Sequence, residues 1–358
     1  MYMETMYQHQ QMVNPTYNDV HPSFKLNGFH LDKDDLCRVA YSFIKEGEDF
    51  ERSVGDFLLD WFDHRDFLEL TTSGTTGDPK TVRINKQAMV NSAVATGKFF
   101  DLVPGNHVLH CLPTKYIAGK MMFVRGFILG LDMDFVAPSS NPLEKNDNRY
   151  DFAAMVPLQA KNSLPKLGCV KKLIVGGMKI NQSLEQELLK LPTQVFETYG
   201  MTETITHIAA KRVGETAFTV LPNVTISYDD RNCLVIHAPA ISEDVIMTND
   251  LVELVNENQF VFLGRVDNVI NSGGIKLMPE KIEEKLAGKI SRNFFVHGAP
   301  DDNLGEKVIL VVEGDETPID RSIFNSLDKY EKPKDIIFVP TFKLTATGKI
   351  MRNETVQC

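Results

Sequence analysis

The segment from Thr72 to Lys80 constrains this chain more than any other. It reads Thr-Ser-Gly-Thr-Thr-Gly-Asp-Pro-Lys, so it combines two glycines, four hydroxyl residues and one lysine. Glycines permit backbone conformations closed to other residues, so successive N–H groups can converge on an anion, while hydroxyls donate and lysine adds charge. We interpret the segment as a phosphate-binding loop, delivered by an apolar strand just before it. Its candidate ligand contacts are Thr72, Ser73, Gly74, Thr75, Thr76, Gly77 and Lys80.

Two other interpretations of this loop are less favoured. The spacing departs from the G-x-x-x-x-G-K-[ST] pattern of P-loop NTPases, because Asp78 and Pro79 follow the second glycine and the lysine comes after them. A flexible surface turn would explain the glycines and hydroxyls. It would not explain such a density of phosphate-binding chemistry.

Composition bounds the class of protein. A chain of 358 residues exceeds one ordinary core, which predicts two domains, and 43% hydrophobic with 24% charged residues is typical of a globular protein. The net charge of −10, without a Lys/Arg block, disfavours a nucleic-acid partner. Five scattered cysteines without a C-x-x-C pair favour a reducing compartment and no structural zinc. No signal peptide or membrane-spanning run is visible, so we expect a cytoplasmic protein without membrane insertion.

The order of apolar and amphipathic runs predicts an α/β fold. The expected helices are Lys86–Phe100, Gly119–Leu131 and Asn181–Leu191. The expected strands are His107–Leu112, Met133–Val136, Val170–Val175 and Gln194–Glu197. Short runs from Phe218 to Phe262 predict a small β subdomain. We therefore predict a large N-terminal domain of layered sheets and helices over 1–263, a hinge at 264–267, and a small mobile C-terminal α+β domain over 268–358.

The run Phe196–Thr204 places an aromatic residue, a glycine and an acid after a strand. At the carboxyl end of a strand, Tyr199 can stack on a base and Gly200 lets the backbone approach a ligand. Glu203 is then placed to hold a magnesium ion that bridges phosphates. An exposed turn followed by a helix capped by Thr202 is equally compatible with the sequence.

Two further segments contain polar residues where a structural explanation is incomplete. A strand breaks at Gly264 and is followed by Arg265-Val266-Asp267, which makes Asp267 a hinge candidate and Arg265 a donor to ribose or phosphate. A plain hairpin would explain the glycines here but not the arginine and aspartate. Near the C-terminus, Gly348 places Lys349 on an exposed turn, where a solvated lysine is the usual interpretation.

Together and in this order, the segments resemble the motifs of the adenylate-forming superfamily of acyl-CoA synthetases, peptide-synthetase adenylation domains and luciferases. The resemblance implies a small carboxylic acid substrate used with ATP, Mg²⁺ and coenzyme A. It implies that the loop holds the β- and γ-phosphates and that the nucleotide is contacted by Gly176, Gly177, Glu197, Thr198, Tyr199, Gly200, Thr202, Asp250 and Arg265.

The resemblance also implies catalytic roles. Lys349 would bond the carboxylate and the α-phosphate, Glu203 would bind Mg²⁺, and Thr76 would act from the loop. The C-terminal domain would then rotate about Asp267. That rotation would bring Gly273, Gly274 and Lys276 to the adenylate for attack by a thiol.

The chain departs from the family pattern at three places. Thr81 follows Lys80 where the family usually has glycine, and Asn249 stands in the middle of the usual Thr-Gly-Asp. Neither change removes a ligand-binding atom. Only 71 residues precede Thr72, fewer than is usual, so either a second copy in a homodimer covers the distal surface or that surface is dispensable.

The acid is predicted from the segment Cys111–Met122 and from overall similarity to the compact o-succinylbenzoate:CoA ligases of menaquinone biosynthesis. Tyr116 lies where many acyl-CoA synthetases have histidine. A dicarboxylate needs a second cation away from Lys349, and the candidates are Lys115, Lys120 and Arg125. For each of these three, a solvated helix face is the alternative.

Three alternatives to this function remain open. The chain could be another acyl- or aryl-CoA synthetase, or a free-standing adenylation enzyme that loads an acid onto a separate carrier protein. It could also be a noncatalytic nucleotide-binding module. The retained Lys80, Glu203, Asp250, Arg265 and Lys349 disfavour the module, since binding alone needs no adenylation lysine.

Overall fold

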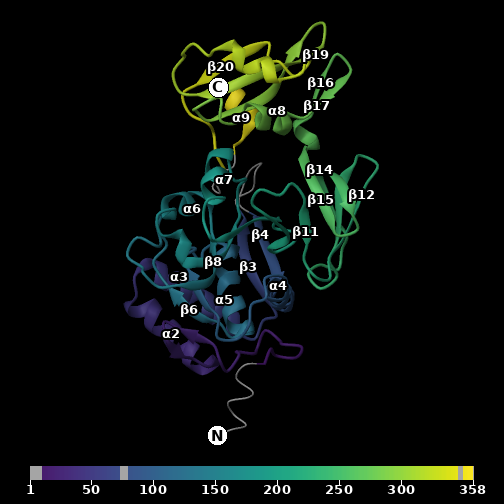
Figure 1. Ribbon diagram of the computed structural model, residues 1–358. Coiled ribbons are helices and arrows are strands. Elements are labelled where there is room, and N and C mark those ends of the chain that lie inside the picture. The colour runs from purple at the N-terminus through teal and green to yellow at the C-terminus, as the bar shows by residue number, and fades with distance from the viewer. Residues whose placement is uncertain (1–9, 73–79, 346–349, 358) are drawn as a thin grey trace.

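The computed structural model describes residues 10–72, 80–345 and 350–357, and two sheets dominate it (Figure 1). The larger has thirteen strands in the order β12-β13-β14-β15-β11-β10-β9-β8-β7-β5-β6-β1-β2. Its strands are β1 Lys25–Leu26, β2 Phe29–His30, β5 His107–His110, β6 Asp132–Phe135, β7 Tyr150–Met155, β8 Val170–Val175, β9 Gln194–Gly200, β10 His207–Arg212, β11 Phe218–Val220, β12 Thr225–Tyr228, β13 Cys233–His237, β14 Ile246–Asn256 and β15 Gln259–Arg265.

The centre of this sheet is parallel and its extension is antiparallel. Strands β6, β5, β7, β8 and β9 run parallel, so their carboxyl ends meet at one edge, where ligands bind in open α/β sheets. From β10 onward each strand is antiparallel to its neighbour, and the strands of the predicted β subdomain extend the same sheet. The sequence prediction missed β7, whose Tyr-Asp-Phe-Ala-Ala-Met has little β-branched character.

In the described part of the chain, six helices flank the parallel strands. They are α2 Lys33–Glu46, α3 Asp49–Phe62, α4 Lys86–Phe99, α5 Ile117–Leu129, α6 Pro157–Ser163 and α7 Gln182–Leu188. Helix α5 is buried on all sides, since Met121, Met122, Phe123 and Phe127 are fully inaccessible. A helix that is apolar all round belongs in a core, and α5 packs against α4 and β5.

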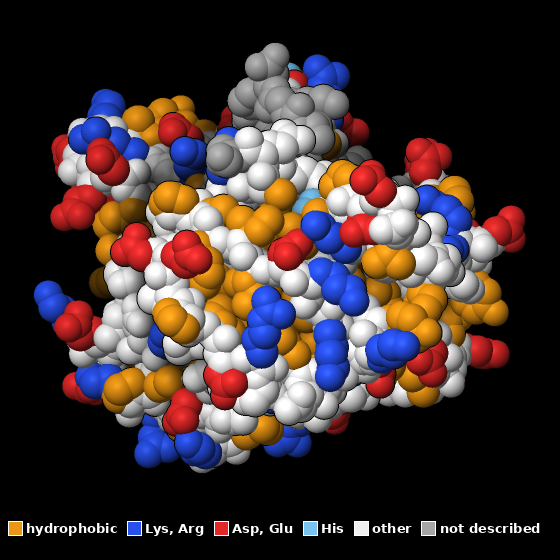
Figure 2. All heavy atoms as spheres, turned by 90° about the horizontal axis from the view of Figure 1, so that it is seen from above, with side chains coloured by type: hydrophobic (Ala, Val, Ile, Leu, Met, Phe, Trp, Pro, Cys, Tyr) orange, Lys and Arg blue, Asp and Glu red, His pale blue; other side chains and the backbone are white. Residues whose placement is uncertain are grey.

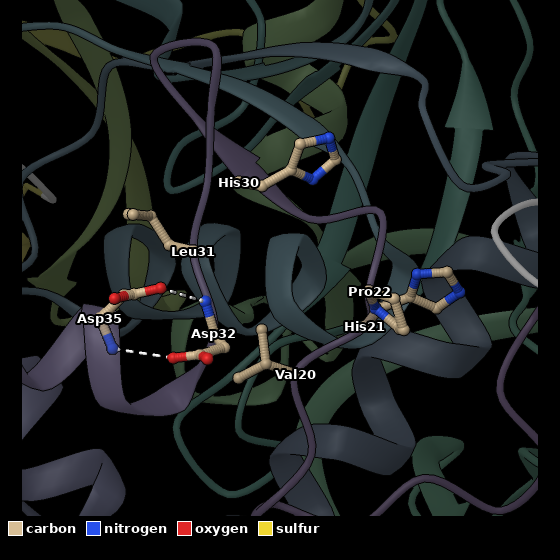
Figure 3. Close-up of a pocket in the computed structure, with 7 residues that line it drawn as sticks. All are labelled: Val20, His21, Pro22, His30, Leu31, Asp32 and Asp35. Atoms are coloured by element: carbon tan, nitrogen blue, oxygen red, sulfur yellow. Dashed lines mark hydrogen bonds between the residues drawn. The ribbon is translucent and has the colours of Figure 1, made fainter. Parts of the chain in front are cut away.

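Helix α2 begins at a capping box that also shapes the surface nearby. The backbone N–H of Asp35 donates to Asp32 Oδ1 at 2.9 Å, and that of Asp32 donates to Asp35 Oδ2 at 3.3 Å (Figure 3). Both carboxylates line a hollow of about 210 Å³ together with Val20, His21, Pro22, His30 and Leu31. Because the two carboxylates satisfy the helix terminus, we assign this hollow a structural origin.

A separate hairpin brackets the predicted phosphate loop. Strand β3 covers Phe67–Thr72 and β4 covers Lys80–Asn85, with Thr72 paired to Lys80. The loop predictions for Ser73, Gly74, Thr75, Thr76 and Gly77 lie outside the described residues. Helix α4 starts directly after β4, one residue shorter at its end than predicted.

A buried ion pair fixes the start of α4. The Lys86 side chain is fully buried, and its Nζ donates to Asp63 Oδ1 at 2.7 Å and to the carbonyl of Arg65 at 2.6 Å. Burial alone would raise the pKa of Asp63, but hydrogen bonds from Lys86 and Arg65 outweigh it and lower the pKa to about 2. The end of α3 is thereby tied to the start of α4.

The second sheet forms a small C-terminal domain at the opposite end of the molecule from helix α2 (Figure 1). Its strands and helices are β16 Ile270–Ser272, β17 Ile275–Leu277, β18 Phe294–Asp301, β19 Gly305–Glu313, β20 Asp335–Val339, α8 Pro279–Leu286 and α9 Arg352–Val356. The fold class is thus α/β with a small C-terminal domain, as predicted. The large sheet ends at Arg265 and the small one begins at Ile270. The predicted hinge at 264–267 therefore covers the end of the large sheet and the start of the connection between the two sheets.

Figure 2 shows Lys and Arg interspersed with Asp and Glu on the face seen from above. No described helix combines the length and apolar character that crossing a membrane requires.

We expect Lys86→Ala to lower the free energy of unfolding by about 1.5–3 kcal/mol, because Asp63 loses its hydrogen bond from Lys86 and keeps the one from Arg65. Chemical denaturation at pH 7 measures this, with the exposed Lys45→Ala as control. The pKa of Asp63 is about 2 in the folded protein, against an ordinary 3.8. Its ion pair therefore stabilises the folded protein above the ordinary pKa, and this stabilisation is lost as the pH falls from 3.8 toward about 2. The difference between variant and wild type should shrink over that range; a constant difference would contradict the assignment.

Candidate active site

The carboxyl ends of β8 and β9 approach closely at Gly176. A Cβ at Gly176 would lie 2.5 Å from Thr198 Oγ1, and that hydroxyl donates to the carbonyl of Val175 at 3.3 Å. Gly177 has a φ of +87°, which favours glycine. The structure therefore places Gly176, Gly177 and Thr198, three of the nucleotide contacts that the resemblance implied, together at this edge of the sheet.

A buried aspartate joins three segments that are far apart in sequence. Tyr199 Oη donates to Asp250 Oδ2 at 2.5 Å, and Arg265 Nε lies 3.7 Å from Asp250 Oδ1. Arg265 Nη2 also donates to Asp267 at 2.9 Å. Burial and then the charge of Asp250 raise the pKa of Tyr199 well above its ordinary value, so the phenol keeps its proton. Four residues that the sequence singled out separately thus form one connected cluster.

Asn249, one of the departures from the family pattern, contacts the candidate hinge. Its Nδ2 lies 3.3 and 3.4 Å from the two carboxylate oxygens of Asp267. Its Oδ1 accepts from Arg231 Nη1 at 3.0 Å. The side chain that replaces glycine therefore bridges the turn after β12 to Asp267.

The segment after β9 turns back into the sheet. Thr202 and Glu203 are exposed on a turn, and the chain then enters β10, so the alternative of a helix capped by Thr202 is wrong. Glu197 is already paired, since Lys211 Nζ lies 3.2 Å from its carboxylate. The exposed Glu203 fits a magnesium ion, which proteins hold by one or two carboxylates plus substrate phosphates.

Gly200 permits the tight passage from β9 to β10. A Cβ there would lie 2.4 Å from the carbonyl oxygen of Thr206 and 2.6 Å from the Cα of His207. Both neighbours are backbone atoms, so they cannot move aside as a side-chain tip could. Only glycine fits this position without a shift of the strands.

The four acid-site candidates divide by burial. Lys115 and Tyr116 are exposed, with Tyr116 at the start of α5. Lys120 faces α3, where its Nζ lies 4.9 Å from the centroid of Phe57. Burial lowers its pKa, opposed by the charges of Asp60 and Asp56. Arg125 alone is fully buried.

Arg125 is a buried cation that lacks an acidic partner among the described residues. Its Nη2 donates to Thr206 Oγ1 at 3.3 Å, and its Nη1 lies 3.6 Å from Met122 Sδ. Its Nε has no hydrogen-bond partner in the part of the chain that the structure describes. Burial lowers the pKa of Arg125 to about 10, so the guanidinium stays charged at neutral pH. Buried charges are normally paired, so this one suits an anionic ligand.

Two buried histidines near Arg125 were missed by the sequence prediction. His110 ends β5 and His207 begins β10, and both are buried. Burial and the charge of Arg125 lower the pKa of His110 to about 3 and that of His207 well below its ordinary value. Both imidazoles are therefore neutral. Each histidine stands at one end of a short strand, next to buried apolar residues, and this position was the signal that the sequence offered.

The predicted thiol segment forms the turn between β16 and β17. Gly273 and Gly274 have φ values of +59° and +84°, and Lys276 is exposed on β17. Lys276 lines a groove of about 840 Å³ between the two domains, together with Tyr228 and Arg231. Lys349, the predicted adenylation lysine, lies outside the described residues.

The fold and the site together define an adenylate-forming enzyme. A model of the AMP-binding enzyme family matches residues 68–232. The crystal structure of an acyl-CoA synthetase (AMP-forming)/AMP-acid ligase II-like protein from Dyadobacter fermentans is 33% identical, with a TM-score of 0.61, and the match covers 89% of this chain and 97% of that one. The chain belongs to this AMP-binding enzyme family.

Particular relatives share one name. The 2-succinylbenzoate–CoA ligase of Salmonella typhimurium is 24% identical over 330 residues, which cover 86% of this chain and 72% of that protein. That of Staphylococcus aureus is 27% identical over 368 residues, covering 90% and 73%. The O-succinylbenzoate coenzyme A synthetase of Bacillus subtilis, solved with ATP and magnesium ion, shares the fold at 21% identity and a TM-score of 0.71, over 80% of this chain and 69% of that one.

We expect Gly200→Ala to destabilise the protein by about 1–3 kcal/mol or more, because the added methyl overlaps backbone atoms of β10. Thermal unfolding should show a lower midpoint. Gly168→Ala is the matched control, since its nearest neighbour would be Pro192 Cγ at 3.5 Å, an ordinary contact. Equal midpoints for the two variants would show that β9 and β10 adjust freely.

Proposed function

We propose that this protein is an ATP-dependent acid:CoA ligase of the cytoplasm that acts through an acyl-adenylate, with 2-succinylbenzoate as its acid. The family membership supports the chemistry, and the shared name of the curated relatives supports the acid. The single observation that carries the choice of acid is Arg125, a buried cation that donates to Thr206, a residue packed against Gly200, and that lacks an acidic partner among the described residues.

The proposed reaction has two halves. A carboxylate oxygen of the acid attacks the α-phosphorus of ATP, the bond to the β-phosphate breaks, and pyrophosphate leaves. The thiolate of coenzyme A then attacks the acyl carbon, AMP leaves with the bonding electrons, and a thioester remains. Negative charge gathers at the α-phosphate in the first half, where Lys349 and loop amides would offset it, as would Mg²⁺.

The described residues would hold the nucleotide as follows. Asp250 would accept hydrogen bonds from the ribose hydroxyls, and Arg265 would keep its carboxylate oriented while donating to the same sugar. Tyr199, held by its bond to Asp250 and packed on Phe260, would present its ring to the adenine. Glu203 would bind the magnesium ion.

The second carboxylate of the acid would bind at Arg125. Removing a carboxylate from water is costly unless a charge and hydrogen bonds replace its hydration. Arg125 supplies both, since its Nε lacks a partner among the described residues and guanidinium geometry matches a carboxylate. A monocarboxylic acid would leave the arginine uncompensated.

An assay of pyrophosphate release and thioester formation with a panel of acids tests the reaction. We expect 2-succinylbenzoate to release pyrophosphate and, with coenzyme A, to give its thioester, ahead of benzoate, a medium-chain fatty acid and amino acids. Lys349→Ala should abolish release while ATP binding persists. Turnover of a different acid would keep the chemistry and remove the substrate assignment. Acyl transfer only to a carrier protein would favour a loading enzyme, and no release with any acid would favour a nucleotide-binding module.

Arg125→Met should lower kcat/KM for 2-succinylbenzoate by at least about thirtyfold, since losing one partner of a buried charge pair costs about 2 kcal/mol or more. The KM for ATP should stay near that of the wild type. Lys115→Met, which changes an exposed lysine on the same segment, is the control and should have little effect. An unchanged kcat/KM in Arg125→Met would refute the assignment of the second carboxylate.

A further inference from the structure

Three side chains, Thr206, His207 and Thr96, connect Arg125 to the backbone of α4 through hydrogen bonds. Thr96 Oγ1 donates its only proton to the carbonyl of Ser92 at 2.9 Å, one turn earlier in α4. Toward His207 Nε2, 3.4 Å away, the Thr96 oxygen can therefore only accept. His207 Nε2 must carry the proton in that contact.

The tautomer of His207 then sets the rest of the chain. A neutral imidazole protonated at Nε2 has a lone pair at Nδ1, so Nδ1 accepts from Thr206 Oγ1, 3.3 Å away. With its proton used there, the Thr206 oxygen accepts from Arg125 Nη2 at 3.3 Å. The bonds run in one direction, from Arg125 through Thr206, His207 and Thr96 to the backbone of α4.

This series of hydrogen bonds uses Nη2 of the Arg125 guanidinium and leaves other buried polar groups without partners among the described residues. Arg125 Nε, Ser92 Oγ and both ring nitrogens of His110 lack partners among the described residues. Buried polar groups are rarely left unpaired, because each one has lost its hydrogen bonds to water without replacement. The free groups lie on α5, which carries Arg125, and on α4 and β5, which pack against α5. They indicate a ligand that accepts hydrogen bonds.

We propose that Thr206 and His207 are positioning residues for acid specificity: they hold Arg125 Nη2 so that Nε remains directed at the second carboxylate of a dicarboxylic substrate. The proposal rests on the proposed function. Without the Thr206 hydroxyl, Nη2 has no acceptor, and the guanidinium can turn to satisfy it elsewhere. Discrimination between a dicarboxylic acid and its monocarboxylic analogue should then fall, because the discrimination depends on the orientation of the Arg125 guanidinium.

The test compares two acids that differ only in the second carboxylate: 2-succinylbenzoate and 4-oxo-4-phenylbutanoate. The readout is the ratio of their kcat/KM values, which a general loss of activity or stability leaves unchanged. Thr206→Val keeps the shape but removes the hydroxyl, and we expect the ratio to fall about three- to thirtyfold. Thr206→Ser restores the hydroxyl and should return the ratio to within about twofold of the wild type. The KM for ATP should be unchanged in both.

Two further variants secure the interpretation. His207→Phe removes the acceptor for Thr206 and should lower the ratio in the same direction. In Arg125→Met, adding Thr206→Val should lower the ratio no further, because Thr206 acts through Arg125.

The outcomes separate the two proposals. A wild-type ratio in both Thr206→Val and His207→Phe, or an additive loss in the double variant, would overturn the positioning role while leaving the function intact. A wild-type enzyme that uses both acids equally would overturn the dicarboxylate assignment and the positioning role with it.

Discussion

The hydrogen bond between Tyr199 and Asp250 is the interaction on which the arrangement of the site depends. It joins the end of the parallel strands to the antiparallel extension of the same sheet. A buried carboxylate is stable only when donors surround it, and Asp250 obtains them from β9 and, through Arg265, from β15. The need to satisfy one charge therefore brings together residues that lie 66 positions apart at the extremes, 199 and 265.

The interior around α5 differs from the surroundings of Asp250, because its buried charge has no opposite charge beside it among the described residues. A helix buried on all sides carries one arginine, and the neighbouring histidines are both neutral, so nothing described there offsets its charge. A purely structural core would have used an apolar side chain at this position, since a buried charge costs stability. Proteins keep buried charges, despite their cost in stability, at sites where ligand binding or catalysis requires them.

The sequence predicted the framework because periodic apolar runs determine it. Strand β8 has the predicted bounds, and α4 differs by one residue at its end. The path after Gly200 was not predictable, since a turn and a helix cap use the same residues and the choice depends on how β10 packs. Tyr199, Asp250 and Arg265 could be singled out as nucleotide candidates because each stands in a recognisable motif, and the structure brings the three together.

The acid site could not be resolved in the same way. Lys115, Lys120 and Arg125 are equivalent as cations on one segment, and only burial distinguishes them. Thr206 and His207 belong to no motif, and their significance comes from hydrogen bonds across three elements. The predictions for Ser73 to Gly77 and for Lys349 remain predictions, because those residues lie outside the described chain.

Asn249 has a consequence for the speed of the enzyme. If the C-terminal domain turns about Asp267 between the two half-reactions, the contacts from Asn249 to both carboxylate oxygens of Asp267 must break and re-form in every cycle. A glycine at this position would leave the hinge carboxylate with fewer restraints. On that hinge hypothesis the amide would restrain the domain rotation, which would lengthen the time spent in one domain orientation and couple the rate of turnover to the Asn249 side chain.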